Sequence, residues 1–279
     1  MYKLNNLLEL FYQKYQEQDK ENIFLQSIKE DKKKYTWENV YTNINKLSEE
    51  ISKDIKKGDR CLIISENRPE WMMLDLSIML SKGITVPVYT SYTERDYEYI
   101  IDDCTPSVII VSNNTQYKKI KNVISRKTFI KKIIFFDEIN NQSKGIHLNI
   151  NDILKKKVCK FKNFFDLKIQ RNDVACIIYT SGTQGTPKGV MLSHGGILNN
   201  CDGAYNLINK FTSKKPKFLT WLPLSHSYEH TVQFVQIALG AKVFYAESID
   251  KLIKNMVDCS PEIMTAVPRF YQNLYQKIN

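Results

Sequence analysis

The chain of 279 residues lacks several features that would define its class directly. Its cysteines form no CxxC pair, which excludes the common zinc and redox motifs; they stand at positions 61, 104, 159, 176, 201 and 259. No apolar run reaches the roughly 20 residues that a bilayer crossing needs, since even Trp71 to Leu80 is interrupted by Asp75. The amino-terminal residues have neither the apolar centre nor the cleavage site of a signal peptide. These absences predict core thiols in a reducing cytoplasm.

Arginine is scarce for so basic a chain. The formal net charge is +10, yet only six of the 40 basic residues are arginine. Recognition of base edges and bidentate binding of phosphate favour arginine over lysine. A nucleic-acid binder is therefore disfavoured, and the scattered lysines are interpreted as a solvated surface. Weak attraction of this surface to an anionic membrane stays open as an alternative.

Apolar runs alternate with amphipathic segments along nearly the whole chain, a pattern typical of mainly parallel sheets covered by helices. The expected strands are 61–65, 84–88, 108–112, 133–136, 174–179, 218–222, 242–245 and 263–266. We interpret residues 1–140 as a first α/β subdomain and residues 173–279 as a second. Between them, residues 141–172 are polar, rich in lysine and poorly periodic, which predicts an irregular connection.

The helices are expected to have recognisable ends. Leu4, Leu7, Leu8, Phe11 and Tyr15 fall on one face of an amino-terminal helix. The other signals are capping residues and terminators. Thr36 can cap a helix that Gly58 ends, Pro69 suits the first turn of a helix that Gly83 ends, and Thr93 with Asp96 resembles the cap of a third.

The most informative segment is YTSGTQGTPKG, residues 179–189, directly after the expected strand 174–179. Glycines at 182, 185 and 189 can adopt positive φ and let backbone N–H groups surround an anion. Lys188 adds a mobile cation worth about 4 kcal/mol against one phosphate charge at about 4 Å and effective dielectric 20. The spacing fits neither a Walker loop nor a dinucleotide fingerprint. A flexible surface loop is the alternative for such a composition.

As an ordered string this segment resembles the phosphate-binding signature of the adenylate-forming enzymes. The blocks at Tyr35 to Trp37, Gly58 to Tyr89, Leu222 to Thr231 and Ala266 to Tyr271 are similar to those of long-chain fatty acid CoA ligases. The resemblance implies the amino-terminal domain of such an enzyme, with ATP, Mg²⁺ and coenzyme A as its cofactors and co-substrates. Gln184 departs from the threonine usual in the family.

The resemblance implies roles for particular residues. The phosphates of ATP would be held by Thr180, Ser181, Gly182, Thr183, Gln184, Gly185, Thr186 and Lys188, with Thr183 as the Mg²⁺ ligand. His226 and Lys188 would be the catalytic residues. The fatty acid would lie beside His226, Tyr228, Glu229 and Arg269. His230 stands where many relatives carry arginine, and His194 is expected to begin or pack a helix.

The expected reaction is activation of a long-chain fatty acid to acyl-adenylate and then acyl-CoA, with release of AMP and pyrophosphate. Relatives continue through further motifs and a carboxy-terminal domain with a catalytic lysine, so these residues alone are expected to be an inactive, incomplete portion. Three alternatives stay open: adenylation of an aryl, medium-chain or amino acid; a shortened nucleotide- or acyl-binding protein without catalysis; and a basic nucleic-acid binder. The expected location is cytoplasmic, with membrane contact and a homodimer both open.

Overall fold

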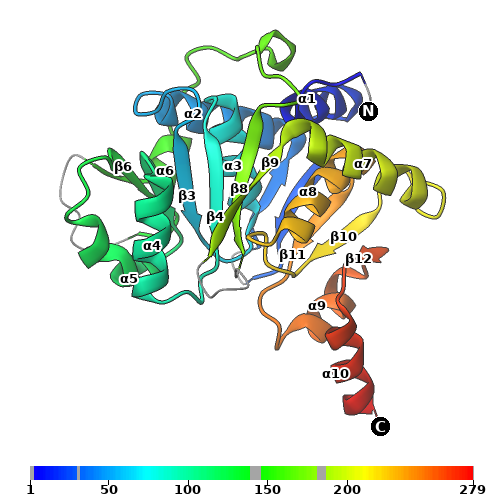
Figure 1. The fold of residues 1–279 in the computed structure, drawn as a ribbon. Coiled ribbons are helices and arrows are strands. Elements are labelled where there is room, and N and C mark those ends of the chain that lie inside the picture. Colours follow the sequence, from blue (N-terminus) through cyan, green and yellow to red (C-terminus); the bar gives the residue numbers. More distant parts are fainter. Residues whose placement is uncertain (1–2, 30–31, 139–145, 181–186, 279) are drawn as a thin grey trace.

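The computed structural model describes residues 3–29, 32–138, 146–180 and 187–278. Within these residues the chain forms one seven-stranded and one five-stranded sheet, flanked by helices (Figure 1). In spatial order the larger sheet contains β7 (His147–Asn149), β6 (Lys132–Phe135), β5 (Val108–Val111), β3 (Arg60–Ile64), β4 (Ile84–Val88), β8 (Val174–Thr180) and β9 (Lys188–Ser193). The smaller sheet contains β12 (Ile263–Met264), β10 (Lys217–Thr220), β11 (Lys242–Tyr245), β1 (Ile23–Ser27) and β2 (Lys34–Thr36).

The helices cover the sheets in layers. They are α1 (Leu7–Glu17), α2 (Trp37–Ile51), α3 (Pro69–Leu80), α4 (Glu94–Cys104), α5 (Asn114–Ile124), α6 (Ile150–Leu154), α7 (His194–Ile208), α8 (Ser227–Leu239), α9 (Leu252–Cys259) and α10 (Pro268–Ile278), with a 3₁₀ turn at Phe164–Asp166. Helices α4 and α5 pack on one face of the larger sheet, and α9 packs on the outer face of the smaller sheet. The largest core lies between the sheets and includes residues of α1, α2, α3, α7 and α8.

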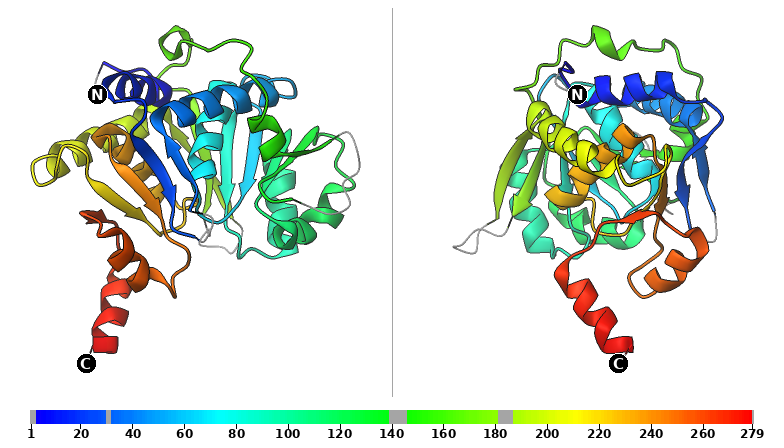
Figure 2. Two further views of the ribbon diagram at one scale, coloured as in Figure 1. Left: turned by 180° about the vertical axis from the view of Figure 1, so that it is seen from behind. Right: turned by 90° about the vertical axis from the view of Figure 1, so that its right-hand side faces the viewer.

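Every expected strand is present, with ends shifted by at most two residues, and the pairings are parallel except for β1 with β2 and β8 with β9. The predicted α/β class is confirmed. Four short strands, β1, β2, β7 and β9, were not expected. Strand β1 lies between β11 and β2, as Figure 2 shows from behind.

The expected irregular connection contains some regular structure. Residues 147–149 extend the larger sheet as β7, and α6 and the 3₁₀ turn follow. The two sheets also exchange strands between the expected subdomains, because β1 and β2 join β10 and β11 while β8 and β9 join β4. The division at residues 140 and 173 stays a prediction about independent units, since it does not coincide with the sheets.

The helix starts follow the predicted signals. Thr36 and Thr93 each form a capping box with the residue three positions later, and Pro69 is the first residue of α3. The expected end of α2 at Gly58 is wrong: the helix stops at Ile51, and Gly58 occupies a later turn with φ +85°. Five of the six cysteines are buried as expected, whereas Cys159 is exposed.

A helix that could cross a bilayer is absent from the described part of the chain, where none combines the necessary length with sufficient hydropathy.

Candidate functional site

The expected phosphate loop is closed at its base by a two-stranded hairpin. Strand β8 ends at Thr180, which pairs with Lys188 at the start of β9, and both residues are exposed. Ser181, Gly182, Thr183, Gln184, Gly185 and Thr186 lie outside the described residues, so their roles stay predictions. The described base of the loop fits an anion site, because it places a hydroxyl and an ammonium group at the exposed end of the hairpin.

Gly189 is needed for packing. It does not use the positive φ that is open to a glycine. A Cβ atom added there would lie 2.9 Å from Cγ2 of Ile177 and 3.3 Å from the ring of Tyr179. The glycine therefore lets β9 lie close to β8. This close approach fixes the position of Lys188, the first residue of β9.

The carboxyl ends of the two sheets meet on the same side of the molecule. Asn67, which follows β3, donates its amide to the carbonyl of Leu222 at 2.6 Å and accepts from the N–H of Leu224 at 3.0 Å. These contacts join the loop after β3 to the loop after β10. Ligands of open α/β sheets bind at such edges, and the loop after β10 leads directly to His226.

His226 caps the amino end of α8 with its ring. Its Nδ1 accepts the N–H of Tyr228 at 3.2 Å, and the side chain is otherwise exposed. Because Nδ1 is an acceptor, the neutral ring carries its proton on Nε2. Nε2–H is therefore available to donate to a bound oxygen atom.

The other residues predicted to contact the acyl substrate differ in exposure and in their contacts; they are Tyr228, Glu229 and Arg269. Tyr228 is 49% exposed and lines a groove. Glu229 is fully buried, accepts from Thr265 Oγ1 at 2.6 Å, and has a second oxygen without a partner among the described residues. Arg269 is exposed on α10, and no hydrogen bond or ion pair joins it to His226, Tyr228 or Glu229 within the described ranges. Of the four residues predicted to contact the acyl substrate, His226 and Tyr228 are therefore joined directly by a hydrogen bond.

Burial strongly perturbs Glu229. Burial raises the pKa of this carboxyl to about 7, and the hydrogen bonds from Thr265 and Thr220 only partly oppose the shift. The group is therefore partly protonated at neutral pH. Its interior position indicates that it supports the start of α8 instead of contacting a ligand from solvent.

An apolar groove runs between α7 and α8. Its volume is about 580 Å³, and it is lined by Leu192, Gly196, Ile197, Asn200, Ala204, Ser227, Tyr228, Thr231, Val232 and Val235. Five of the lining residues are aliphatic, and the polar groups come from Asn200 on α7 and from Ser227, Tyr228 and Thr231 in the first turns of α8. Such a groove can hold an alkyl or aryl group.

A buried ionic cluster ties α8 to its neighbours. Nε2 of His230 lies 2.8 Å from Asp75 of α3, and Nδ1 lies 3.4 Å from the sulfur of Cys176 in β8. Gln233 donates to the same carboxylate oxygen at 2.9 Å. Burial alone would lower the pKa of His230, but the carboxylate of Asp75, with Cys176, raises it well above the ordinary value. The ring is therefore the cation of a buried pair.

Comparison with known proteins assigns the chain to a family. The family model described as AMP-binding enzyme matches residues 11–279. The chain belongs to the AMP-binding enzyme family. This membership confirms the expectation drawn from the phosphate-loop string and the blocks around it.

Relatives and solved structures agree with the family. The chain is 28% identical over 257 residues to long chain acyl-CoA synthetase 3 of Arabidopsis thaliana, covering 87% of this chain and 38% of that protein. It is 28% identical to human long-chain-fatty-acid–CoA ligase 6, covering 77% of this chain and 32% of that protein. The chain thus spans about a third of the length of these relatives.

Among solved structures, the inhibitor-bound N-terminal domain of FACL13 from Mycobacterium tuberculosis matches with a TM-score of 0.83 at 18% identity, covering 98% of this chain and 65% of that one. ATP-bound MatB from Rhodopseudomonas palustris matches with a TM-score of 0.77 at 20% identity, covering 98% and 51%. At these identities the likeness shows a shared fold.

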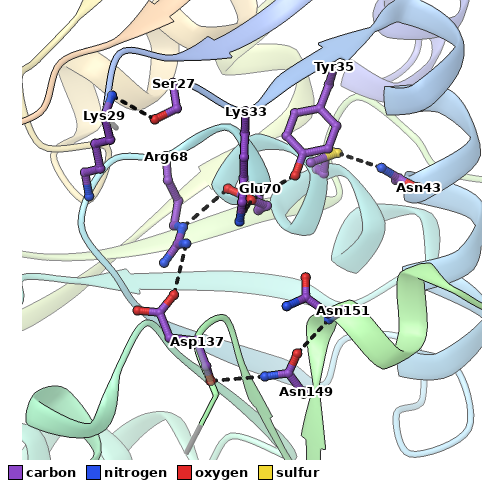
Figure 3. Close-up of polar contacts among 11 residues, drawn as sticks. Ser27, Lys29, Lys33, Tyr35, Asn43, Arg68, Glu70, Asp137, Asn149 and Asn151 are labelled. Carbon is purple, nitrogen blue, oxygen red and sulfur yellow. Dashed lines mark hydrogen bonds and ion pairs between the residues drawn. The ribbon is translucent and has the colours of Figure 1, made fainter. Parts of the chain in front are cut away.

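One ionic network of this AMP-binding chain was not expected from its sequence. Figure 3 shows Glu70, at the start of α3, accepting from Lys33, Tyr35 and Arg68 at 2.9, 2.9 and 3.3 Å. Arg68 continues to Asp137 after β6 at 3.2 Å. Burial would raise the pKa of Glu70, but Arg68 and Lys33 lower it. The network holds β2 against the start of α3.

Sequence reasoning also missed the partners of His230. The one available signal was Asp75, a charge inside an otherwise apolar helix, because such a residue needs a buried partner. Local sequence could not indicate which residue supplies it, since His230 is 155 positions away. No cluster of three or more potential metal ligands occurs among the described residues.

Proposed function

We propose that this chain provides the nucleotide- and acyl-binding part of an enzyme that activates a long-chain fatty acid with ATP. The products would be an acyl-adenylate and then acyl-CoA, with release of AMP and pyrophosphate. Family membership and relatives named as long-chain acyl-CoA synthetases support this proposal. The observation that carries it is the apolar groove between α7 and α8, whose lining includes Ser227 and Tyr228, the two residues that follow His226.

The difficult step brings a carboxylate to the α-phosphate of ATP, so charge neutralisation and positioning supply most of the catalysis. Lys188 and Thr180, at the base of the loop, are suited to hold the phosphates. Nε2–H of His226 is suited to orient the acid or the developing acyl phosphate. Mg²⁺, with Thr183 as its proposed ligand, would neutralise phosphate charge when bound.

The groove favours an aliphatic acid because burial contributes about 0.8 kcal/mol per methylene. Activation of an aryl, medium-chain or amino acid would use the same chemistry. A shortened protein without catalysis would still bind ATP or a fatty acid.

ATP–pyrophosphate exchange by the longest natural polypeptide containing this chain separates these cases. Palmitate, octanoate, benzoate and leucine should be compared as acids, and we expect the highest rate with palmitate. Lys188→Ala and His226→Ala should each lower exchange at least about tenfold, since each removes a charge or donor aimed at the reacting groups. Lys157→Ala, an exposed lysine beyond α6, is the matched control. Exchange that prefers benzoate or leucine would assign another acid, and binding without any exchange would favour the non-catalytic alternative.

A further inference from the structure

The carboxyl end of α7 and the loop to β10 carry exposed apolar and basic side chains together. This surface, the α7 tip, comprises Leu207, Lys210, Phe211, Lys214, Lys215 and Lys217. Leu207 is 65% exposed and Phe211 is 81% exposed, the most exposed large apolar residue of the described chain. Figure 1 shows the tip projecting from the body on the side opposite α4 and α5.

The lysines of the tip are not neutralised by neighbouring side chains. Lys210, Lys214 and Lys215 are exposed, and no salt bridge involves them within the described ranges. Glu262, an acidic residue bonded to this loop, accepts from the backbone N–H and the hydroxyl of Ser213 at 3.2 and 3.0 Å. It also accepts from the backbone N–H of Lys217 at 3.3 Å. Its carboxylate therefore holds the loop in place and interacts electrostatically with Lys217, whereas no ion pair joins it to Lys210, Lys214 or Lys215 within the described ranges.

The tip continues the helix face that lines the apolar groove. Asn200 and Ala204 line the groove, and Leu207 follows at helical spacing on the same face of α7. Phe211 comes one turn later, where its N–H bonds to the carbonyl of Ile208 at 2.9 Å. Apolar surface thus extends from the groove to the exposed end of the helix.

We propose that the α7 tip docks on an anionic lipid bilayer, with Phe211 and Leu207 entering the interface and the lysines contacting lipid phosphates. Isolated apolar side chains need no explanation, but a protruding Phe and Leu among unpaired lysines have the two properties that interfacial anchoring requires. Nucleic acid fits less well, because the tip contains no arginine. The docking itself is independent of the enzymatic activity. Its use in delivering a fatty acid to the groove rests on the proposed function.

Co-sedimentation of residues 1–279 with vesicles tests the docking without ATP or fatty acid. We expect binding to phosphatidylcholine vesicles that contain phosphatidylserine, little binding to pure phosphatidylcholine, and weakening as salt rises. The double variant Leu207→Ser, Phe211→Ser should lower the partition coefficient about tenfold, because both apolar anchors are lost. The partition coefficient should fall at least as much when three charges are reversed together by Lys210→Glu, Lys214→Glu and Lys215→Glu.

Matched controls lie on the segment after α6. Phe161→Ser removes another exposed phenyl ring, and Lys157→Glu, Lys160→Glu and Lys168→Glu combined make the same change of charge. Both should leave binding within about twofold of the parent chain, because their side chains lie outside the proposed contact surface. In a separate measurement, the fluorescence of Phe211→Trp should shift to the blue when anionic vesicles are added.

The docking would be overturned if the chain showed no preference for anionic vesicles. It would also be overturned if the tip and control variants lost equal amounts of vesicle binding. A third contrary result would be release of the chain from vesicles by a single-stranded oligonucleotide that occupies only a small fraction of the chains. Failure of acid-dependent exchange in the longer polypeptide would refute the proposed function and leave vesicle binding unaffected. The two proposals therefore fail separately.

Discussion

Two buried titratable residues near the start of α8 determine how this part of the molecule responds to pH. Glu229 and His230 are adjacent in sequence, and both are fully buried. Glu229 contacts the smaller sheet through Thr265, and His230 contacts α3 and β8 through Asp75 and Cys176. Because His226 caps the same helix, these contacts fix the position of the proposed catalytic ring.

His230→Ala should destabilise the chain by about 3–5 kcal/mol, because it leaves Asp75 charged and buried without its cation. The free energy of unfolding, measured by urea denaturation at pH 6, reports this loss. Replacing both Asp75 and His230 by Leu should cost less than either single change, and additive losses would contradict the ion pair.

The ion pair also predicts a pH dependence. The pKa of His230 in the folded chain is well above its ordinary 6.5. Its stabilisation is therefore complete below about pH 6.5 and is lost as pH rises through the folded value. The His230→Ala variant should lack this alkaline loss, and an unchanged pH profile in the variant would exclude the pair as its source.

The variant Glu229→Gln should lose a second pH dependence of the free energy of unfolding. The pKa of Glu229 is raised from 4.5 to about 7 in the folded chain. The folded chain holds this proton more tightly, so stability is complete below about pH 4.5 and falls as pH rises to about 7. The loss is on the order of 3 kcal/mol. Urea denaturation at pH 5 and pH 8 should show the difference in the parent chain and a smaller one in the variant. Equal differences in both would contradict a perturbed Glu229.

At the scale of elements, local signals located most helix starts and strands. Thr36, Pro69 and Thr93 begin helices as predicted because capping involves residues only a few positions apart. The strands β1, β2, β7 and β9 were missed. Strands β2 and β7 have only three residues each, and β9 is an exposed edge strand. Strand β1 pairs with β11, which lies more than 200 residues further along the chain. Such pairing leaves no local pattern in the sequence.

The cap of α4 gives an element-scale prediction. Thr93 accepts from the N–H of Asp96 at 3.3 Å and donates its N–H to the Asp96 carboxylate at 2.9 Å. Thr93→Ala should lower the free energy of unfolding by about 1 kcal/mol, because the first turn of α4 loses its hydroxyl acceptor. Ser91→Ala, in the exposed turn before the helix, is the control and should change little in thermal denaturation. A loss no larger than that of the control would show that the box does not stabilise α4.

For the molecule as a whole, α8 links the two sheets to the proposed site. His230 contacts β8 of the larger sheet, and Gln236 donates to Thr220 of the smaller sheet at 2.7 Å. Resemblance predicted the family and drew attention to His226 and Tyr228. It could not place Glu229 in the interior or reveal the groove, because both depend on how α8 packs against α7 and the sheets. The contacts of α8 therefore connect the hairpin of β8 and β9 to the groove proposed for the acyl chain.

Filling the groove should separate long acids from short ones. In Ala204→Trp the indole would enter the groove at one of its lining positions and reduce the space open to a long chain. Displacement of a fluorescent fatty-acid probe from residues 1–279 by palmitate should weaken at least about tenfold, since two lost methylene contacts suffice. Octanoate should be affected much less because its shorter chain needs less of the groove. Gly203→Trp places the same side chain on α7 at a position with open space around it, so it should leave both affinities unchanged. Two results would show that the groove does not measure the length of an acyl chain. Either both variants weaken the affinity for palmitate equally, or Ala204→Trp weakens the affinities for palmitate and octanoate equally.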